Sequence, residues 1–121
     1  MAKNMEISLL FDFYGDMLTE KQRDVVELYY NDDLSLSEIA ENEGITRQGV
    51  RDSIKRAEAQ LLEMEDRLGL ARRFHDIRDA LESIRQAARE IQDLNGRYGY
   101  SHEIDDRAHR IAELTGRIAE A

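Results

Sequence analysis

The chain has 121 residues and a formal net charge of −9. This length fits one domain, or one small domain with an appended helical element, and leaves no room for a separate catalytic domain. The acidic charge argues against a protein that coats nucleic acid through bulk electrostatics, and the absence of cysteine excludes disulfides and thiolate zinc sites.

Proline is also absent, so no position is barred from a helix by the geometry of a proline ring. The glycines are therefore the main signals for helix ends and turns. Strand signals are weak throughout, and we expect an all-α fold. No apolar run approaches the length of a membrane span, and the N-terminus leads into a charged amphipathic helix instead of a signal-peptide core. Together with the lack of cysteine, these features favour a cytoplasmic protein.

Two helices are predicted before residue 31. Residues 5–17 carry apolar side chains at helical spacing, with Gly15 weakening the last turn. The next helix is predicted over residues 20–30, because Thr19 is a favoured N-cap and Gln22, three residues on, can complete a capping box.

Residues 35–57 predict a helix-turn-helix. Ser35 and Glu38 form a second capping-box pattern, Gly44 suits a turn that needs positive φ, and Thr46 can cap the second helix. The two helices are expected to face each other through small and branched apolar residues, namely Leu36, Ile39, Ala40, Val50, Ile54 and Ala57. The second helix is also the most basic stretch of an acidic half: residues 1–65 hold 7 Lys and Arg against 15 Asp and Glu.

The helical pattern then continues to about Leu68, where Gly69 predicts a break or bend. Beyond it, apolar residues alternate spacings of four and three over about three heptads, as in a coiled-coil seam. These residues are Leu70, Phe74, Ile77, Leu81, Ile84, Ala88 and Ile91. All of them except Ala88 are the predicted dimer interface.

Two glycines within residues 95–100 interrupt this helix, and Ser101 predicts a fresh helix start. Residues 1–68 are therefore predicted to form the helix-turn-helix domain, and residues 69–121 a helical hairpin that serves as a dimerisation element. Alternatively, the seam packs within the chain, either against residues 5–17 or against the last helix.

The sequence resembles two related groups of proteins. The segments L-T-E-K-Q-R (18–23), L-S-E-I-A-E (36–41), G-I-T-R-Q-G-V (44–50) and I-K-R-A-E (54–58) look like the region-4 domain of bacterial sigma factors. Over residues 5–75 the chain resembles more closely the YlxM family of helix-turn-helix proteins, whose pattern also includes L-F-D-F-Y (10–14) and the Tyr29–Tyr30 pair. The resemblance implies an accessory or regulatory role in protein targeting by the signal recognition particle, because such proteins are encoded beside its GTPase.

The resemblance also implies a nucleic-acid site on the second helix of the motif. Carried over by position, Thr46, Arg47, Gln48 and Arg51 would face bases or nearby backbone, and Lys55 and Arg56 would hold phosphates. The alternative is that these are solvated residues on an exposed helix. Five carboxylates compete with any phosphate docked there, those of Asp32, Asp33, Glu38, Glu41 and Glu43.

An enzyme is not expected. His75, His102 and His109 lack a serine or cysteine partner at a recognisable site, and a polar helix start explains the acidic residues around His102 better than a metal site does. There is no phosphate-binding G-x-x-x-x-G-K-[ST] loop, and no cofactor is expected. Three functions stay open: a factor linked to the signal recognition particle that binds DNA or RNA, a DNA-binding transcription regulator, and a purely protein-binding adaptor.

Overall fold

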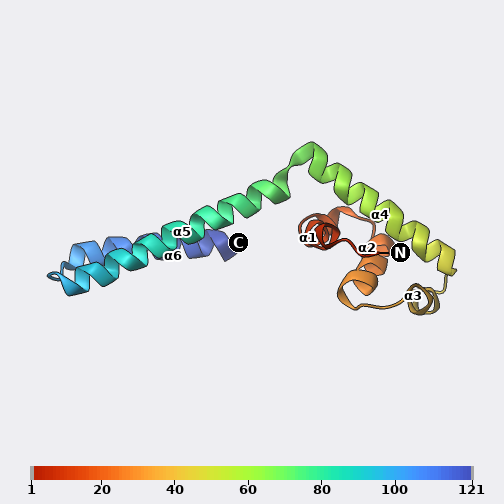
Figure 1. The fold of residues 1–121 in the computed structure, drawn as a ribbon, viewed down its shortest axis with the longest axis horizontal. Helices are drawn as coiled ribbons and strands as arrows, with labels where there is room; N and C mark the ends of the chain where they lie inside the picture. The colour runs from red at the N-terminus through yellow and green to blue at the C-terminus, as the bar shows by residue number, and fades with distance from the viewer. Residues whose placement is uncertain (1, 121) are drawn as a thin grey trace. The chain divides into compact units, whose positions relative to one another are not determined.

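The computed structural model describes residues 2–120, and these contain helices and no strand, which confirms the predicted all-α fold (Figure 1). In chain order the elements are α1 (Met5–Tyr14), η1 (Gly15–Met17), α2 (Glu20–Val26), η2 (Glu27–Asn31), α3 (Leu36–Glu43), α4 (Arg47–Leu68), α5 (Leu70–Arg97) and α6 (His102–Glu120). Within the described range, no helix is long and apolar enough to cross a membrane. The chain divides into two compact units between Ala71 and Arg72.

The predicted starts of α2 and α3 are confirmed by their caps. The Gln22 amide donates to Thr19 Oγ1 at 3.2 Å and the Thr19 amide donates to Gln22 Oε1 at 3.1 Å. Ser35 and Glu38 exchange the same two bonds, each at 3.1 Å. Each box satisfies two amide groups that the first turn of a helix leaves without a partner.

Two predicted helices end in a different geometry from the one expected. After α1 the chain tightens into the 3₁₀ turn η1, where a Cβ on Gly15 would stand 3.1 Å from the Phe11 ring. After α2 it widens into the π turn η2, in which the Asp32 amide donates to the Glu27 carbonyl at 3.1 Å. A π turn contains one more residue than an α-helical turn. The turn includes Tyr29 and Tyr30, which pack edge to face with their ring centroids 5.2 Å apart.

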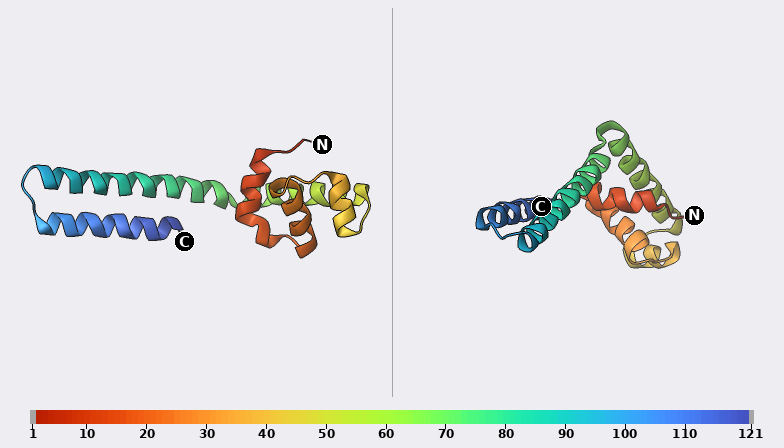
Figure 2. Two further views of the ribbon diagram at one scale, coloured as in Figure 1. Left: turned by 90° about the horizontal axis from the view of Figure 1, so that it is seen from below. Right: turned by 60° about the vertical axis from the view of Figure 1, so that its left-hand side comes forward.

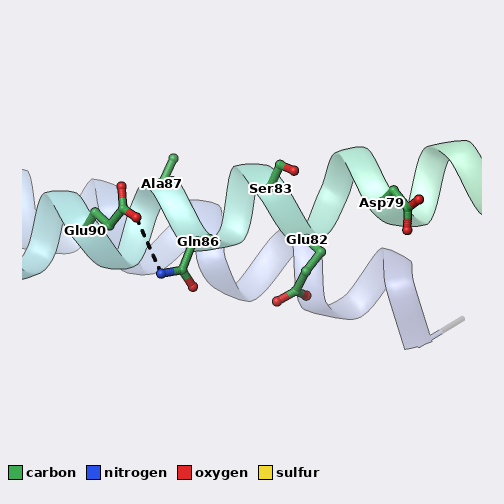
Figure 3. A pocket seen from close by; sticks show the side chains of 6 residues that line it. All are labelled: Asp79, Glu82, Ser83, Gln86, Ala87 and Glu90. Carbon is green, nitrogen blue, oxygen red and sulfur yellow. Dashed lines mark hydrogen bonds between the residues drawn. The ribbon is translucent and has the colours of Figure 1, made fainter.

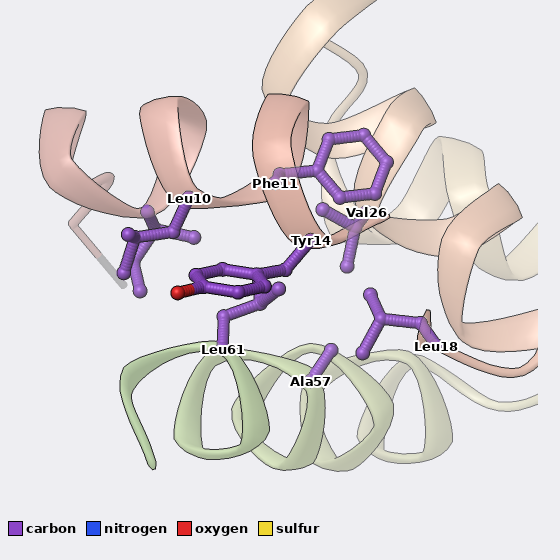
Figure 4. Close-up of a cluster of buried hydrophobic side chains, with 8 residues drawn as sticks. Leu10, Phe11, Tyr14, Leu18, Val26, Ala57 and Leu61 are labelled. Atoms are coloured by element: carbon purple, nitrogen blue, oxygen red, sulfur yellow. The ribbon is translucent and has the colours of Figure 1, made fainter. Parts of the chain in front are cut away.

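The core of the first unit consists of two clusters, and α4 contributes to both. Ala57 and Leu61 pack into the cluster drawn in Figure 4, with Ile7, Leu10, Phe11, Tyr14, Leu18 and Val26. Val50 and Ile54 pack into the other, with Val25, Tyr29 and Ile39. These four α4 residues have no exposed surface. The predicted apolar face of the second helix of the helix-turn-helix is thereby confirmed, and it continues one turn further to Leu61.

The predicted break at Gly69 is a left-handed residue with φ 60°. Beside it, the Tyr14 hydroxyl donates to Glu65 Oε1 at 2.8 Å and accepts from the Leu70 amide at 3.2 Å. Burial and the Glu65 carboxylate raise the pKa of Tyr14. The end of α4 is therefore fixed to α1 by a hydrogen-bonded tyrosine as well as by apolar packing.

The second unit is the predicted helical hairpin, in which α5 and α6 run side by side in opposite directions (Figure 2). Its turn is closed by Asn95, which donates to the Ser101 carbonyl at 2.9 Å and accepts from the Ser101 amide at 3.0 Å. The residues buried in this unit are small or polar, namely Ala88, Asn95, Ala108 and Thr115. Ile77, Ile84 and Ile91 of the predicted seam keep 44–47% of their surface exposed.

We expect Leu61→Ala to lower the free energy of unfolding by about 2–5 kcal/mol, because it opens a cavity in a fully buried site. Leu62→Ala is the matched control, since the neighbouring side chain is 40% exposed and its truncation should cost about 1 kcal/mol or less. Urea unfolding followed by circular dichroism measures both. Equal losses for the two variants would contradict the placement of α4.

The capping box at α3 predicts a pH dependence of stability. The hydrogen bond from the Ser35 amide lowers the pKa of Glu38 below its ordinary value of 4.5. A carboxyl with a depressed folded pKa contributes stability that is present above the unfolded pKa and is lost as the pH falls through the folded pKa. We therefore expect Glu38→Gln, which keeps an acceptor but does not titrate, to lose less stability than the parent between about pH 6 and about pH 3.

The control for this measurement is Glu41→Gln, on the same helix but outside the capping box. It removes one negative charge without removing the carboxylate that accepts the Ser35 amide. If both variants lose stability with falling pH as the parent does, the Glu38 bond is not a source of the dependence.

Candidate nucleic-acid interface

The predicted recognition residues lie on the first half of α4, held by the turn that precedes it. Gly44 adopts φ 67°, which costs glycine least, and the Ile45 amide donates to the Ala40 carbonyl at 3.1 Å. Ile39 of α3 is buried with Val50 and Ile54 of α4. This packing fixes one side of α4 toward the core and turns the opposite side to solvent.

The solvent side of α4 carries a basic stripe. Arg47, Arg51 and Lys55 recur every four residues, so they lie along one face of the helix, and all three are exposed. Gln48 and Arg56 are also exposed and lie on the adjacent face. The structure thus brings five of the six predicted residues onto one accessible surface.

Two of the predicted residues already have partners within the protein. Thr46 Oγ1 accepts from the Gly49 amide at 2.9 Å, so this side chain is the N-cap of α4. Gln48 donates from Nε2 to Asp52 Oδ1 at 2.9 Å. A base contact by Gln48 would have to replace this bond, whereas the basic stripe is the part of the site directed to solvent.

Some of the neighbouring carboxylates also have partners. Glu38 accepts from the Ser35 amide, and Asp33 pairs with Lys3, which lowers the pKa of the Asp33 carboxyl. Asp32, Glu41 and Glu43 complete the acidic set; the first two are exposed and Glu43 is half-buried. These charges oppose phosphate, so the stripe is positive within an acidic surround.

A depression of about 520 Å³ lies where the start of α2 meets α4, on the flank of α4 away from the basic stripe, and none of Arg47, Arg51 and Lys55 lines it. Its polar lining includes Lys21 and Ser53, which sequence reasoning did not select, together with Arg56. The only signal for Lys21 was its place in the first turn after the Thr19 cap. Lys21 and Arg56 share this lining with the Asp52 carboxylate, so the depression is a separate feature from the stripe.

The depression described on the hairpin is acidic. A depression of about 550 Å³ on α5 is lined by residues of that helix alone, including the carboxylates of Asp79, Glu82 and Glu90 (Figure 3). The three histidines each sit one helical turn from a carboxylate, at 3.4 Å for His75–Asp79 and His102–Asp106 and 4.0 Å for His109–Glu113. Among residues 2–120, no group of three or more His, Asp or Glu could hold a metal ion.

Comparison with known proteins connects this fold to a family. A family model described as "Putative helix-turn-helix protein, YlxM / p13 like" matches residues 1–97. A UPF0122 protein of Thermoanaerobacter sp. (strain X514) is 42% identical over 108 residues, covering 89% of this chain and 92% of the relative. A UPF0122 protein of Bacillus thuringiensis (strain Al Hakam) is 44% identical over 95 residues, covering 78% and 86%.

The match extends further than the resemblance seen in the sequence. A UPF0122 protein of Geobacillus kaustophilus (strain HTA426) is 39% identical over 114 residues, or 94% of this chain and 98% of the relative. The family model likewise runs past the helix-turn-helix to the end of α5. The chain therefore belongs to the YlxM/p13-like family of helix-turn-helix proteins.

Proposed function

We propose that this protein is a non-enzymatic regulatory or accessory factor that binds nucleic acid through the basic stripe of α4. The observation that supports this most directly is the exposure of Arg47, Arg51 and Lys55 along one face of the second helix of a helix-turn-helix. In proteins of this kind the second helix lies in the major groove, and its N-terminal residues reach base edges while flanking residues hold phosphates. Arg47 and Arg51 would then read bases or hold nearby phosphates.

The charge balance sets the expected strength of binding. A net charge of −9 and the carboxylates of α3 oppose a polyanion, so affinity should be modest and steeply salt-dependent. Lys55 and Arg56 would hold phosphates one to two turns along α4. The proposed ligand is thus a short stretch of nucleic acid docked locally on α4.

A link to the signal recognition particle is a further part of this proposal, and it rests on the resemblance to the YlxM family. The chain lacks a phosphate-binding GTPase loop, so its role in such a pathway would be that of a partner. The proposal also includes a homodimer, which the heptad pattern predicts. Two helix-turn-helix domains in one assembly suit a nucleic-acid site with two-fold symmetry.

A protein-binding adaptor is the second candidate, because α1 exposes an apolar stripe. Met5, Leu9 and Phe13 recur every four residues and are 79%, 68% and 40% exposed. Exposed apolar side chains that line up in this way are typical of a contact surface. On this alternative the helix-turn-helix is a scaffold, and α4 does not bind nucleic acid.

The nucleic-acid proposal predicts the effect of Arg51→Ala. Removing one phosphate contact should lower affinity and reduce the slope of log K against log salt by about 0.9 for duplex DNA. Fluorescence anisotropy over a salt titration measures both quantities. Duplex DNA and the RNA of the signal recognition particle, tested side by side, distinguish a transcription regulator from a factor of the targeting pathway.

Arg67→Ala is the matched control, because Arg67 lies at the other end of α4 and pairs with Glu63 at 3.1 Å. It removes the same charge from the same helix, so a change confined to Arg51→Ala locates the ligand at the stripe. Equal weak binding by the parent and both variants would contradict nucleic-acid binding by α4 and would favour the protein-binding adaptor.

A further inference from the structure

The hairpin presents its largest apolar side chains outward. Six isoleucines lie in two rows, each with a spacing of seven residues, and are 40–53% exposed: Ile77, Ile84 and Ile91 on α5, and Ile104, Ile111 and Ile118 on α6. A spacing of seven keeps successive side chains on one face of a helix that packs in a bundle. We call this surface the isoleucine face.

Hydrogen bonds near the turn fix the register of the two rows. Asn95 pairs with Ser101, and Gln92 Nε2 donates to Asp105 Oδ1 at 3.3 Å. When this antiparallel register is continued along the hairpin, each isoleucine of α5 lies at the same height along the helix axes as one isoleucine of α6. The three levels are Ile91 with Ile104, Ile84 with Ile111, and Ile77 with Ile118.

Small residues occupy the interior of the hairpin. Ala88 and Ala108 are 1% and 2% exposed, with Asn95 and Thr115 the other buried side chains among residues 72–120. Such an interior removes little apolar surface from water, and two helices alone make a marginal core. The isoleucine face is the larger apolar surface, so the hairpin has the pattern of half a four-helix bundle.

We propose that two copies of this chain pair through their isoleucine faces into a four-helix bundle, with α5 of each copy beside α6 of the other. The two copies would be related by a two-fold axis along the bundle. Each level of the bundle would then contain four isoleucines, two from each copy. The interface is isologous, because the same surface serves on both sides.

The size of the face fits a second copy. The 19 residues of α6 span about 28 Å at a rise of about 1.5 Å per residue, and two helices of about 10 Å diameter give a width of about 20 Å. Each copy would cover about 560 Å², or roughly 1,100 Å² for the pair, which exceeds the approximately 1,000 Å² expected of a specific interface. A partner with the same seven-residue repeat also interdigitates at every level, and a second copy provides that repeat on both helices.

Charge selects between the two symmetric ways of pairing the faces. On the edge of α5 that lies away from α6, helical register places Asp76 and Glu90, and the corresponding edge of α6 carries Arg110 and Arg117, with Glu103 as the exception near the turn. Placing α5 beside α6 of the second copy brings Asp76 within one turn of Arg117 and, by the same offset, Glu90 within one turn of Glu103, so one contact is attractive and the other repulsive. Placing like helices together would instead bring the Arg110 edges into contact.

Side-chain size favours the same pairing. In the space between the isoleucine rows of neighbouring copies, α5 offers Ala80, Ala87 and, near the turn, Leu94, and α6 offers Arg107 and Leu114; the two leucines are 50% and 47% exposed. With α5 beside α6 of the second copy, Leu114 lies level with Ala80, so a large residue meets a small one. Pairing α5 with α5 would oppose the two alanines and leave a gap, which is disfavoured in a packed interface.

The first test is the mass of the particle in solution, measured by light scattering on the full chain without nucleic acid. We expect the parent to have twice the 14.0 kDa chain mass, and Ile84→Glu to shift to the single-chain mass. Gln86→Glu is the matched control: it adds the same charge two residues away, on the side of α5 turned from the isoleucine face, among the side chains shown in Figure 3, and should remain a dimer. A monomeric parent, or an Ile84→Glu variant that stays dimeric, overturns the proposal.

Circular dichroism accompanies each mass measurement. If Ile84→Glu loses helix content, the milder variant Ile111→Gln is measured in its place. The proposal requires this variant to keep its helix content and to be a monomer or a weaker dimer than the parent. The parent's dissociation on dilution should move to higher concentration in that variant. Unchanged dissociation would overturn the proposed face.

The second test is a charge exchange that is specific to the arrangement of helices. Asp76→Arg and Arg117→Asp should each raise the dimer dissociation constant by roughly 2- to 30-fold, the range expected for two exposed ion pairs in a symmetric dimer. The double variant Asp76→Arg/Arg117→Asp should recover most of the parent affinity. A double variant that is no tighter than the single ones overturns the pairing of α5 with α6.

This inference does not depend on the proposed nucleic-acid function, because both tests are made on the protein alone. Arg51→Ala should be as dimeric as the parent. Loss of nucleic-acid binding and loss of the dimer are therefore separate outcomes, observed in different variants.

Discussion

Burial of one face of α4 is the interaction on which the first unit depends. Val50, Ile54, Ala57 and Leu61 have no exposed surface. The first two pack with α2, the π turn and α3, and the last two pack with α1 and α2. A single helix therefore joins two clusters that would each be too small alone. The same packing orients the basic stripe, because a helix with one buried face must present the opposite face to water.

The turn chemistry around α3 explains how an acidic segment can stand beside a basic helix. Glu38 is part of the capping box that starts α3, and its carboxylate accepts the Ser35 amide. Asp33 pairs with Lys3. These negative charges serve the local fold, since a carboxylate near a helix N-terminus is favourable. The acidic surround is thus partly a consequence of how the helix-turn-helix is capped, and it lowers the electrostatic attraction available to any nucleic acid.

The hairpin shows the opposite distribution of residue sizes from the first unit. In the first unit large branched and aromatic side chains are buried, whereas in the hairpin alanines are buried and isoleucines are half exposed. The Asn95–Ser101 pair sets both the turn and the register, so it also sets which isoleucines are level with one another. A distribution of this kind is expected of a segment whose apolar face is completed by another set of helices.

The sequence by itself determined the features that depend on local interactions. Thr19, Ser35, Gly44, Thr46 and Gly69 were predictable as caps and breaks, because a cap needs only a side chain and an amide a few residues apart. The helix periods also identified which residues share a face. Only the tertiary structure decided what covers each face. It widened the end of α2 into a π turn around Tyr29 and Tyr30, and it separated one heptad seam into buried Ala88 and half-exposed Ile77, Ile84 and Ile91. The reason is physical, since periodicity fixes direction around a helix axis but not the neighbour that lies in that direction.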